Sequence, residues 1–346
     1  MQPKHYSQSK AAWHLDRIES LRADVVPAPV HVQLVLSDLC NHNCSFCAYR
    51  RGDGLSTELF ADEDGNTNPN RRIDTAKALE IVEDCAAIEV QAIQFTGGGE
   101  PTVHKDHLQI FARAQELGMQ TALVTNGVKL RPVPANLGHA WIRVSVDAGT
   151  EATYCAVREV SPKHWRLVWE NIRAIADSGY DGVLSVGFVA TNDNYLEVGR
   201  CAALAKEAGA SSMRVGAVFT NQGMKFYDDV DAVRTSIAQA VDEHGDFISN
   251  LFDRRVGDLE HGRPDDPFCG YQYLTTYIGA DLGVYRCCNT SYTKRGTIGS
   301  LVNARFRDVA LYPKPFDARG CNYCQFLGQN TVIKSLLDRP VHVEFV

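Results

Sequence analysis

The sequence predicts an α/β protein: a curved, partial (β/α)6 barrel of the TIM type, followed by a small cysteine-rich α+β domain. Two observations carry this prediction. Six apolar, β-rich runs alternate with helical periods between about residues 30 and 220, an order typical of a parallel sheet. From Pro264 onward, short strands, turns and cysteines replace that order. A flat doubly wound sheet is the alternative, although no Gly-x-Gly-x-x-Gly fingerprint follows the first strand.

The predicted elements follow one another in a regular order. The strands are rich in apolar and β-branched residues and cover residues 31–36, 92–95, 121–125, 141–146, 183–189 and 213–218. The helices repeat apolar residues every three or four positions and cover residues 75–88, 107–117, 165–178 and 196–208. This alternation places the ends of successive strands, and the loops that follow them, at one edge of the sheet.

The chain divides into four predicted parts. Residues 1–29 form an N-terminal extension, residues 30–225 the barrel, residues 226–262 a charged helical bridge and residues 263–346 the cysteine-rich domain. Within the barrel, residues 51–72 are polar and rich in Gly, Asp and Asn. We interpret them either as a long surface loop that acts as a lid, or as a disordered insertion.

Composition and charge exclude several classes of protein. The chain has 346 residues, of which 45% are hydrophobic and 22% charged, and a net charge of −7. That charge disfavours broad binding to nucleic acid, which needs an excess of Lys and Arg. No apolar run approaches the roughly eighteen residues of a membrane span, and the first thirty residues lack the apolar core of a signal peptide. We therefore expect a cytoplasmic protein without a membrane partner.

Cysteine usage points to metal. The chain has 11 cysteines. Two groups contain most of them: the first lies at residues 40, 44 and 47, and the second at residues 269, 287, 288, 321 and 324. In a reducing compartment, clustered cysteines are more often metal ligands than disulfide partners.

The first group, Cys40-x3-Cys44-x2-Cys47, directly follows the first predicted strand. Three thiolates can ligate three irons of a cubane cluster and leave the fourth iron free to chelate a methionine moiety. The loop resembles the signature of the radical S-adenosylmethionine (SAM) superfamily, including the aromatic Phe46 before the last cysteine. That resemblance implies a [4Fe–4S] cluster, bound SAM, a 5′-deoxyadenosyl radical and an external one-electron reductant such as flavodoxin or ferredoxin.

A glycine-rich turn follows the second predicted strand. It reads Thr96-Gly-Gly-Gly-Glu100-Pro and resembles the superfamily's Gly-Gly-Glu motif, which holds the amine of SAM. Glycines allow a close approach of the backbone to a ligand, and a carboxylate suits an ammonium group. We therefore expect Gly98, Gly99 and Glu100 to bind the cofactor. A plain tight turn is the alternative.

Three further polar residues are expected near the ribose of SAM. Ser145 and Asp147 alternate with apolar residues at the end of the fourth strand, so they share one strand face. Asn126 follows the third strand in an Asn-Gly pair. The resemblance implies cofactor contacts for all three, whereas a capped strand end and a common turn are the alternatives.

The second cysteine group resembles the C-terminal SPASM and twitch extensions of radical SAM enzymes. A predicted hairpin, Asp281-Leu-Gly-Val-Tyr-Arg-Cys287, keeps most of the family pattern with its glycine displaced by one position. The resemblance implies that Cys287 joins the ligands of an auxiliary [4Fe–4S] cluster, with Cys288 as its rival. The remaining expected ligands are Cys269, Cys321 and Cys324. A zinc site with four cysteines is the alternative.

The expected activity is hydrogen abstraction from a small molecule or a peptide. A fully ligated auxiliary cluster suits oxidative modification, either dehydrogenation or C–S or C–C bond formation, because it accepts an electron from the substrate radical. One alternative is redox-neutral epimerisation, with Cys155 as the hydrogen donor. Another is a non-catalytic iron–sulfur or zinc scaffold, which would leave the glycine-rich turn without a role.

Overall fold

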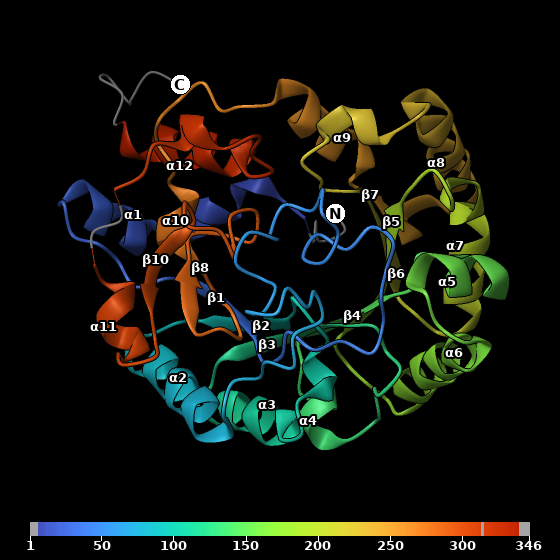
Figure 1. Cartoon of the computed structure of the whole chain (residues 1–346), viewed down its shortest axis with the longest axis horizontal. Helices are drawn as coiled ribbons and strands as arrows, with labels where there is room; N and C mark the ends of the chain where they lie inside the picture. Colours follow the sequence, from blue (N-terminus) through green and yellow to red (C-terminus); the bar gives the residue numbers. More distant parts are fainter. Residues whose placement is uncertain (1–5, 313–314, 339–346) are drawn as a thin grey trace.

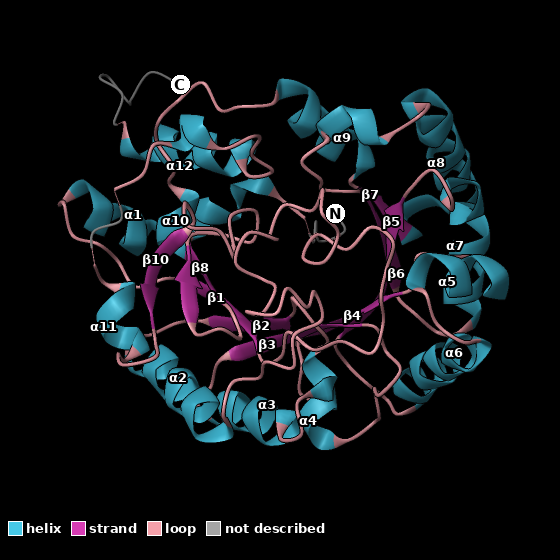
Figure 2. Ribbon diagram, in the orientation of Figure 1, coloured by secondary structure: helices cyan, strands magenta, loops and turns pink. Residues whose placement is uncertain are grey.

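The computed structural model describes residues 6–312 and 315–338. Its centre is one ten-stranded sheet with the strand order β10-β9-β8-β1-β2-β3-β4-β5-β6-β7. The sheet curves through the molecule, and most helices lie on its outer side (Figures 1 and 2). The prediction of an α/β fold with a curved parallel sheet is therefore confirmed.

Six consecutive parallel strands form the middle of the sheet. They are β1 (His31–Val35), β2 (Ala92–Thr96), β3 (Gln120–Thr125), β4 (Trp141–Ser145), β5 (Val183–Ala190) and β6 (Ser212–Ala217). Each lies within two residues of its predicted bounds. β1 pairs with β2 in the register His31 to Ala92 and Val35 to Thr96, so the loops after these strands begin side by side.

The helices of the outer layer connect these strands. They are α2 (Thr75–Ala87), α3 (His107–Glu116), α4 (Pro134–Leu137), α5 (Glu151–Arg158), α6 (Pro162–Asp177) and α7 (Val198–Glu207). The apolar spacing sets which face each helix buries: Val168, Ile172 and Ile175 of α6 are completely buried. Two start signals are visible in sequence, since the Asp74 side chain accepts a hydrogen bond from the amide of Ala76, and Thr150 caps α5.

The sheet continues beyond the six predicted strands at both ends. β7 (Ile248–Asn250) lies in the predicted helical bridge between α8 (Val230–His244) and α9 (Phe252–His261), and it pairs in parallel with β6. β8 (Thr275–Ile278) pairs in parallel with β1. Sequence reasoning missed β7 and the pairing of β8 with the barrel, because three or four residues are too short to show a period.

The C-terminal part adds an antiparallel edge to the same sheet. β9 (Gly283–Tyr285) pairs with β8, which confirms the predicted hairpin, and β10 (Thr297–Ser300) pairs with β9. The helices that follow are α11 (Phe306–Ala310) and α12 (Leu327–Leu337). The cysteine-rich segment is thus continuous with the barrel sheet through β8.

The N-terminal extension packs against the C-terminal helix. It contains the 3-10 helix η1 (Gln8–Trp13) and α1 (Leu15–Arg22), and α10 (Tyr271–Leu274) lies nearby. A small apolar cluster joins these elements to α12: Ala11, Ile18, Val30, Leu274 and Ile333. The remaining 3-10 helices are η2 (Pro101–Val103), η3 (Tyr195–Glu197), η4 (Gly223–Phe226), η5 (Gly245–Phe247) and η6 (Ala318–Gly320).

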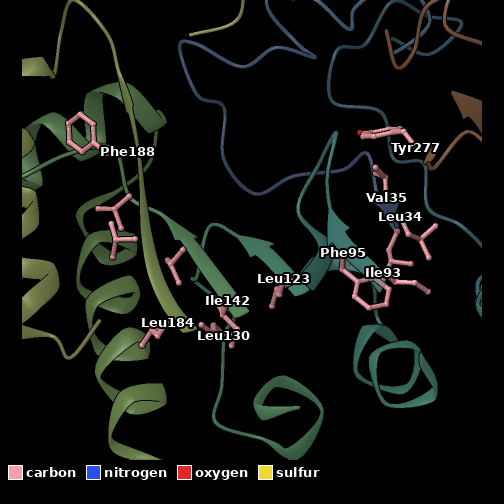
Figure 3. Packing of buried hydrophobic residues seen from close by; sticks show 14 of the residues in the cluster. Leu34, Val35, Ile93, Phe95, Leu123, Leu130, Ile142, Leu184, Phe188 and Tyr277 are labelled. Carbon is pink, nitrogen blue, oxygen red and sulfur yellow. The ribbon is translucent and has the colours of Figure 1, made fainter. Parts of the chain in front are cut away.

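The two faces of the sheet differ in character. Side chains on the outer face, such as Phe95, Leu123 and Ile142, are completely buried, and Figure 3 shows them on the helix side of the sheet. The inner face is more polar, as the alternate residues Gln33 and Gln94 illustrate. No helix within residues 6–312 and 315–338 is long and apolar enough to span a bilayer.

Residues 51–72 are ordered and packed. Phe60 is completely buried, and its ring meets those of Tyr49 and Tyr292 at centroid distances of 5.4 and 4.9 Å. Isolated bridges join Gly54 to Thr220 and Ser37 to Arg72. The interpretation as a disordered insertion was therefore wrong: a loop that is polar in composition is anchored by one buried aromatic ring.

Candidate cofactor site

Two loops meet at the C-terminal ends of β1 and β2. The cysteine loop follows β1 and the glycine-rich turn follows β2. The backbone N–H of Gly99 donates to the carbonyl of Ser37 at 3.0 Å, and that of Glu100 donates to the carbonyl of Leu39 at 3.1 Å. The structure therefore brings the glycine-rich turn into contact with the residues just before Cys40.

The glycines of the turn have no room for a side chain. A Cβ on Gly99 would lie 2.3 Å from the carbonyl oxygen of Leu39, and one on Gly98 would lie 2.4 Å from the ring of Phe60. A Cβ on Gly97 would lie 1.8 Å from the carbonyl oxygen of Gly99. Close packing thus explains all three glycines, against backbone for Gly97 and Gly99 and against side chains for Gly98.

The cysteine loop is held by hydrogen bonds to its own sulfurs and backbone. The amide of Cys47 donates to the carbonyl of Cys44 at 3.1 Å, and the amide of His42 lies 3.5 Å from the Sγ of Cys40. Burial raises the pKa of Cys40 to about 12, with a further contribution from Glu100, and burial also raises the pKa of Cys47. Bound iron would supply the positive charge that allows these thiols to ionise.

Three cysteines lie on one loop directly after β1. In the described parts of the chain, no group of three His, Cys, Asp or Glu side chains is arranged to hold a single metal ion. A [4Fe–4S] cluster takes one thiolate per iron, so the chemistry of three thiols on one loop fits three of its irons.

Glu100 links the strand ends to one another. Its Oε1 accepts hydrogen bonds from Thr102 and from the hydroxyl of Thr125, and its Oε2 accepts one from the amide of Asn126 at 2.7 Å. The Asn126 side chain in turn donates to the Oδ1 of Asn41 at 2.7 Å, within the cysteine loop. The carboxylate and Asn126 are thus brought together, and Oε2 keeps acceptor capacity for a ligand.

The structure adds Arg158, which the sequence gave no reason to select. Its Nη1 lies 3.3 Å from the Sγ of Cys44, and its Nη2 pairs with the carboxylate of Asp147. Arg158 and Asp147 are 5% and 1% exposed, so this ion pair is shielded from water. Asp147 also accepts from the amide of Val189 at 2.6 Å. Asp147 therefore lies near the cysteine loop, where its carboxylate is paired with Arg158.

The end of α5 supports the cysteine loop through its backbone. The carbonyls of Val157 and Arg158 accept hydrogen bonds from the amides of Ser45 and Asn43 at 2.9 and 3.1 Å. The carbonyl groups at a helix C-terminus lack partners within the helix, so they are free to hold another segment. The aromatic Phe46 lies under the guanidinium of Arg158, 5.8 Å from ring centroid to Cζ.

The 51–72 loop and its flank hold the other side of the cysteine loop. The guanidinium of Arg50 donates to the carbonyl of His42 at 2.6 Å and also contacts Asn68. The Oδ1 of Asn68 accepts from the amide of Cys40 at 3.0 Å. Sequence reasoning missed these residues, because a buried Arg–Asn pair has no distinctive spacing.

The remaining candidates of the first site lie apart from this network. Ser145 is on the inner face of β4, half-buried and paired in register with Gly187 of β5. Cys155 lies on α5 beside the buried Tyr154 and is itself partly exposed. Among the described residues, no hydrogen bond joins the Cys155 side chain to the cysteine loop. Its role as a hydrogen donor stays a prediction.

The second cysteine group surrounds one cavity. Cys269, Cys287, Cys321 and Cys324 all line it, together with aromatic residues that include Phe316 and Phe326. Burial raises the pKa of all four thiols, and each of Cys269, Cys321 and Cys324 is also raised by the nearby Cys287. Four thiols at one cavity, with the guanidinium of Arg286 among the other lining groups, have the chemistry of ligands for a metal cluster.

Cys288 points elsewhere. It does not line this cavity, and its Sγ accepts a hydrogen bond from the Nε2 of Gln325 at 3.2 Å. Its carbonyl accepts from Ser291 at 3.0 Å. The geometry therefore favours Cys287 over its neighbour as a ligand.

Comparison with known proteins agrees with this arrangement. The sequence model of the Radical SAM superfamily matches residues 34–204. The S-adenosylmethionine-dependent nucleotide dehydratase of Flammeovirga pacifica is 31% identical over 180 residues, which are 50% of this chain and 57% of that protein. The PqqA peptide cyclase of Methylorubrum populi is 30% identical over 148 residues, 41% of this chain and 35% of that protein.

One solved structure extends the likeness to most of the chain. The crystal structure of Streptococcus suis SuiB bound to precursor peptide SuiA superimposes on 90% of this chain and 72% of that chain, with a TM-score of 0.62 and 13% identity. This likeness shows the fold: an α/β structure with a parallel sheet.

The parallel sheet with a three-cysteine loop after its first strand defines a radical SAM protein. The chain belongs to the radical SAM superfamily and is an enzyme of that class. Membership implies SAM as cofactor and a [4Fe–4S] cluster that binds it. The chain spans about half the length of the first of these curated relatives and about a third of the second.

Proposed function

We propose that Cys40, Cys44 and Cys47 hold the SAM-binding cluster, and that Gly98, Gly99 and Glu100 bind the methionine amine. The observation that carries this proposal is the contact between the two loops: the amides of Gly99 and Glu100 are hydrogen-bonded to the backbone just before Cys40. When bound, the cluster and SAM supply a 5′-deoxyadenosyl radical that removes a hydrogen atom from the substrate. Asn126, Ser145 and Asp147 are proposed to contact the ribose of SAM, on the strength of their positions at the ends of β3 and β4.

The protein's own residues position and shield this chemistry. Arg158 donates to the Cys44 sulfur, so it offsets negative charge on that ligand. The completely buried ring of Phe60 packs against Gly98 of the glycine-rich turn, and its proposed role is to keep water from the site. Exclusion of water protects a reactive radical from side reactions.

We propose that the second group holds an auxiliary [4Fe–4S] cluster in a twitch-like domain over residues 263–346. The support is the single cavity lined by Cys269, Cys287, Cys321 and Cys324. Four protein ligands leave no iron open for substrate, which favours a role in electron transfer. An oxidative outcome follows, because the substrate radical then has an electron acceptor within the protein.

The substrate class we propose is a small molecule, with a peptide as the alternative. One relative is named as a nucleotide dehydratase and another as a peptide cyclase, so both classes occur among proteins similar to this chain. The polar inner face of the sheet favours a polar small molecule. The reductant is proposed to be an external one-electron carrier such as flavodoxin or ferredoxin.

Anaerobic reconstitution tests this function. Protein loaded with iron and sulfide is mixed with SAM and dithionite, and 5′-deoxyadenosine is measured. We expect cleavage by the unmodified enzyme and none by the Cys44→Ala variant, whereas Cys85→Ala, a completely buried cysteine of α2, should keep activity. Equal cleavage by Cys44→Ala would refute the proposal. Transfer of deuterium from labelled extracts into 5′-deoxyadenosine then identifies the substrate.

A further inference from the structure

The inner face of the sheet borders a cavity of about 980 Å³. The starts of the parallel strands line one side of it, through inner-face residues such as Gln33, Gln94 and Ser185. The 3-10 helix η1, α9 and α12 contribute the other side. Its volume is at the upper end of the roughly 300–1,000 Å³ of small-molecule sites. The proposed cofactor residues do not line it, because they lie at the other ends of the strands.

This cavity is positively charged in a protein whose net charge is −7. Its basic and imidazole-bearing lining residues are Lys10, His14, His31, Arg143, Arg254 and Arg255. Glu89 is the acidic residue among the lining residues described, and it lies exposed at the turn before β2. The cavity therefore carries an excess of positive charge that its own lining does not neutralise.

Among the described residues, no carboxylate forms an ion pair with Arg143, Arg214 or Arg254, and Arg255 has a single ion pair, with Asp258. The Nε atoms of Arg214, Arg254 and Arg255 are buried without a hydrogen-bond partner among the described residues. Arg255 is 7% exposed; its Nη1 donates to the carbonyl of Gln325 at 2.9 Å and lies 3.6 Å from the carboxylate of Asp258. For Arg143 and Arg214, the described contacts are aromatic rings, with Cζ 5.4 Å from the centroid of Trp141 and 5.7 Å from that of Tyr6.

The positive charges of these neighbouring guanidinium groups repel one another. Burial, followed by the charges of Arg143, Arg255 and Arg254, lowers the pKa of Arg214 to about 9. A buried guanidinium without a counter-charge is costly, and a bound anion would relieve that cost. Arg143, Arg254 and Arg255 line the cavity and Arg214 lies beside them; this cluster of four is called the arginine floor below.

The inner strand face between the arginine floor and the cofactor site carries two glycines. Arg143 and Ser145 lie on the same face of β4, two residues and therefore roughly 7 Å apart. On the neighbouring strands, Gly187 and Gly216 carry no side chain: a Cβ there would lie 3.4 Å from the Cγ of Arg143 and 3.8 Å from the Nη2 of Arg214. The inner face of β4 to β6 thus leads from Arg143 toward Ser145 past positions without side chains.

We propose that the arginine floor binds the phosphate group of a small-molecule substrate, whose reacting part lies toward Ser145. This proposal rests on the proposed function, since it deepens the substrate class of the same enzyme. Four guanidinium groups offer more donors than one carboxylate accepts, whereas a phosphate presents several acceptor oxygens and up to two charges. The aliphatic and aromatic surroundings hold the guanidinium groups in place before the ligand arrives.

Isothermal titration with inorganic pyrophosphate tests the site on the reconstituted enzyme with SAM bound. We expect saturable binding that Arg143→Gln and Arg214→Gln each weaken about tenfold, because each removes charge-assisted hydrogen bonds. Arg166→Gln, an exposed arginine of α6, is the matched control and should leave affinity unchanged. Equal weakening by all three variants, no saturable binding, or tighter binding of succinate than of pyrophosphate would overturn the proposal.

Thermal stability distinguishes a binding role from a structural one. If the arginine floor awaits an anion, Arg214→Met should raise the melting temperature in the absence of ligand, and pyrophosphate should stabilise the unmodified enzyme but not the variant. A lower melting temperature for Arg214→Met, together with unchanged pyrophosphate affinity, would assign the arginine a structural role. SAM cleavage without substrate should persist in these variants. Its absence in the unmodified enzyme would instead refute the proposed function.

Discussion

The Nη1 of Arg158 lies 3.3 Å from the Sγ of Cys44. This contact joins the last residue of α5 to the middle of the cysteine loop, and Asp147 completes the network from the end of β4. A hydrogen bond from a cation to a ligand sulfur stabilises the more reduced state of an iron–sulfur cluster, because that state carries more negative charge. Arg158 is therefore placed to raise the reduction potential of the proposed cluster as well as to hold the cysteine loop.

Replacing Arg158 by Met should lower the reduction potential of the SAM-binding cluster. The physical reason is the loss of a positive charge and a hydrogen-bond donor at Cys44. Potentiometric titration followed by electron paramagnetic resonance measures this shift. The single variant should also be less stable, by about 3–5 kcal/mol, because it leaves the buried Asp147 unpaired.

A double variant separates the two effects. In Arg158→Met with Asp147→Asn, no unpaired charge remains, so much of the lost stability should return while the potential stays low. A potential that recovers together with stability would show that Arg158 acts through folding alone.

Replacing Glu100 by Gln should weaken SAM binding about tenfold and leave iron content unchanged. The carboxylate faces the position proposed for the methionine amine, and the neutral amide loses that charge-assisted contact. Equilibrium binding of SAM to the reconstituted protein gives the affinity, and a colorimetric assay gives the iron.

Thr102→Val serves as the control for Glu100. It removes a hydroxyl that donates to Oε1 at 2.7 Å but keeps the carboxylate charge. SAM affinity should therefore change by no more than about twofold, or about 0.4 kcal/mol, because the carboxylate charge that meets the amine is kept. If both variants bind SAM equally poorly, SAM affinity depends on the hydrogen-bond network around Glu100 and not on the charge of its carboxylate.

Cys287→Ala should lose about half of the iron, since it removes a ligand from one of two proposed four-iron clusters. Cys288→Ala should keep all of it, because Cys288 does not line the cavity and is hydrogen-bonded to Gln325. Iron and zinc analysis with visible spectra measures both. If Cys288→Ala loses the iron and Cys287→Ala keeps it, Cys288 is the ligand and Cys287 is not. Zinc in place of iron would refute the auxiliary cluster.

Stability must be followed in the same variants. A protein that lacks the auxiliary cluster should still cleave SAM, because the first site has its own ligands, but it should fail to complete an oxidative reaction. If Cys287→Ala melts at the same temperature as Cys288→Ala, that failure reports lost electron transfer.

The sequence predicted those parts of the molecule that follow from periodicity and spacing. The six central strands and four helices follow from patterns of apolar residues, and the cysteine loop follows from its spacing. Long-range packing was invisible to this reasoning. Arg158 and Arg50 look like ordinary charged residues until the fold buries them, and β7 is too short to show a period. Leu282, in the turn of the hairpin, has a φ of 62°, a left-handed conformation that its residue type does not suggest.

Phe60 is another residue whose long-range packing could not be predicted from the sequence. It lies in the 51–72 loop, whose composition suggested disorder. The ring is completely buried between Tyr49 and Tyr292, and its edge contacts the position where Gly98 would carry a Cβ. The carbonyl of Phe60 also accepts a hydrogen bond from Arg71 at 2.9 Å, and Arg71 pairs with the buried Asp38 at 2.6 Å. The loop is thus fastened over both loops of the cofactor site.

Phe60→Ala should lower the free energy of unfolding by about 3–5 kcal/mol and expose the cofactor site to solvent. The first effect follows from the loss of a buried aromatic ring and the cavity that it leaves. The second follows from its place over Gly98, and it should appear as several-fold faster bleaching of the clusters in air. Glu63→Ala, an exposed residue of the same loop, should change stability by less than about 0.5 kcal/mol and leave bleaching unchanged. Anaerobic denaturant titration and absorbance decay measure the two effects. If Phe60→Ala is destabilised but bleaches at the normal rate, the ring supports the core without shielding the cofactor site.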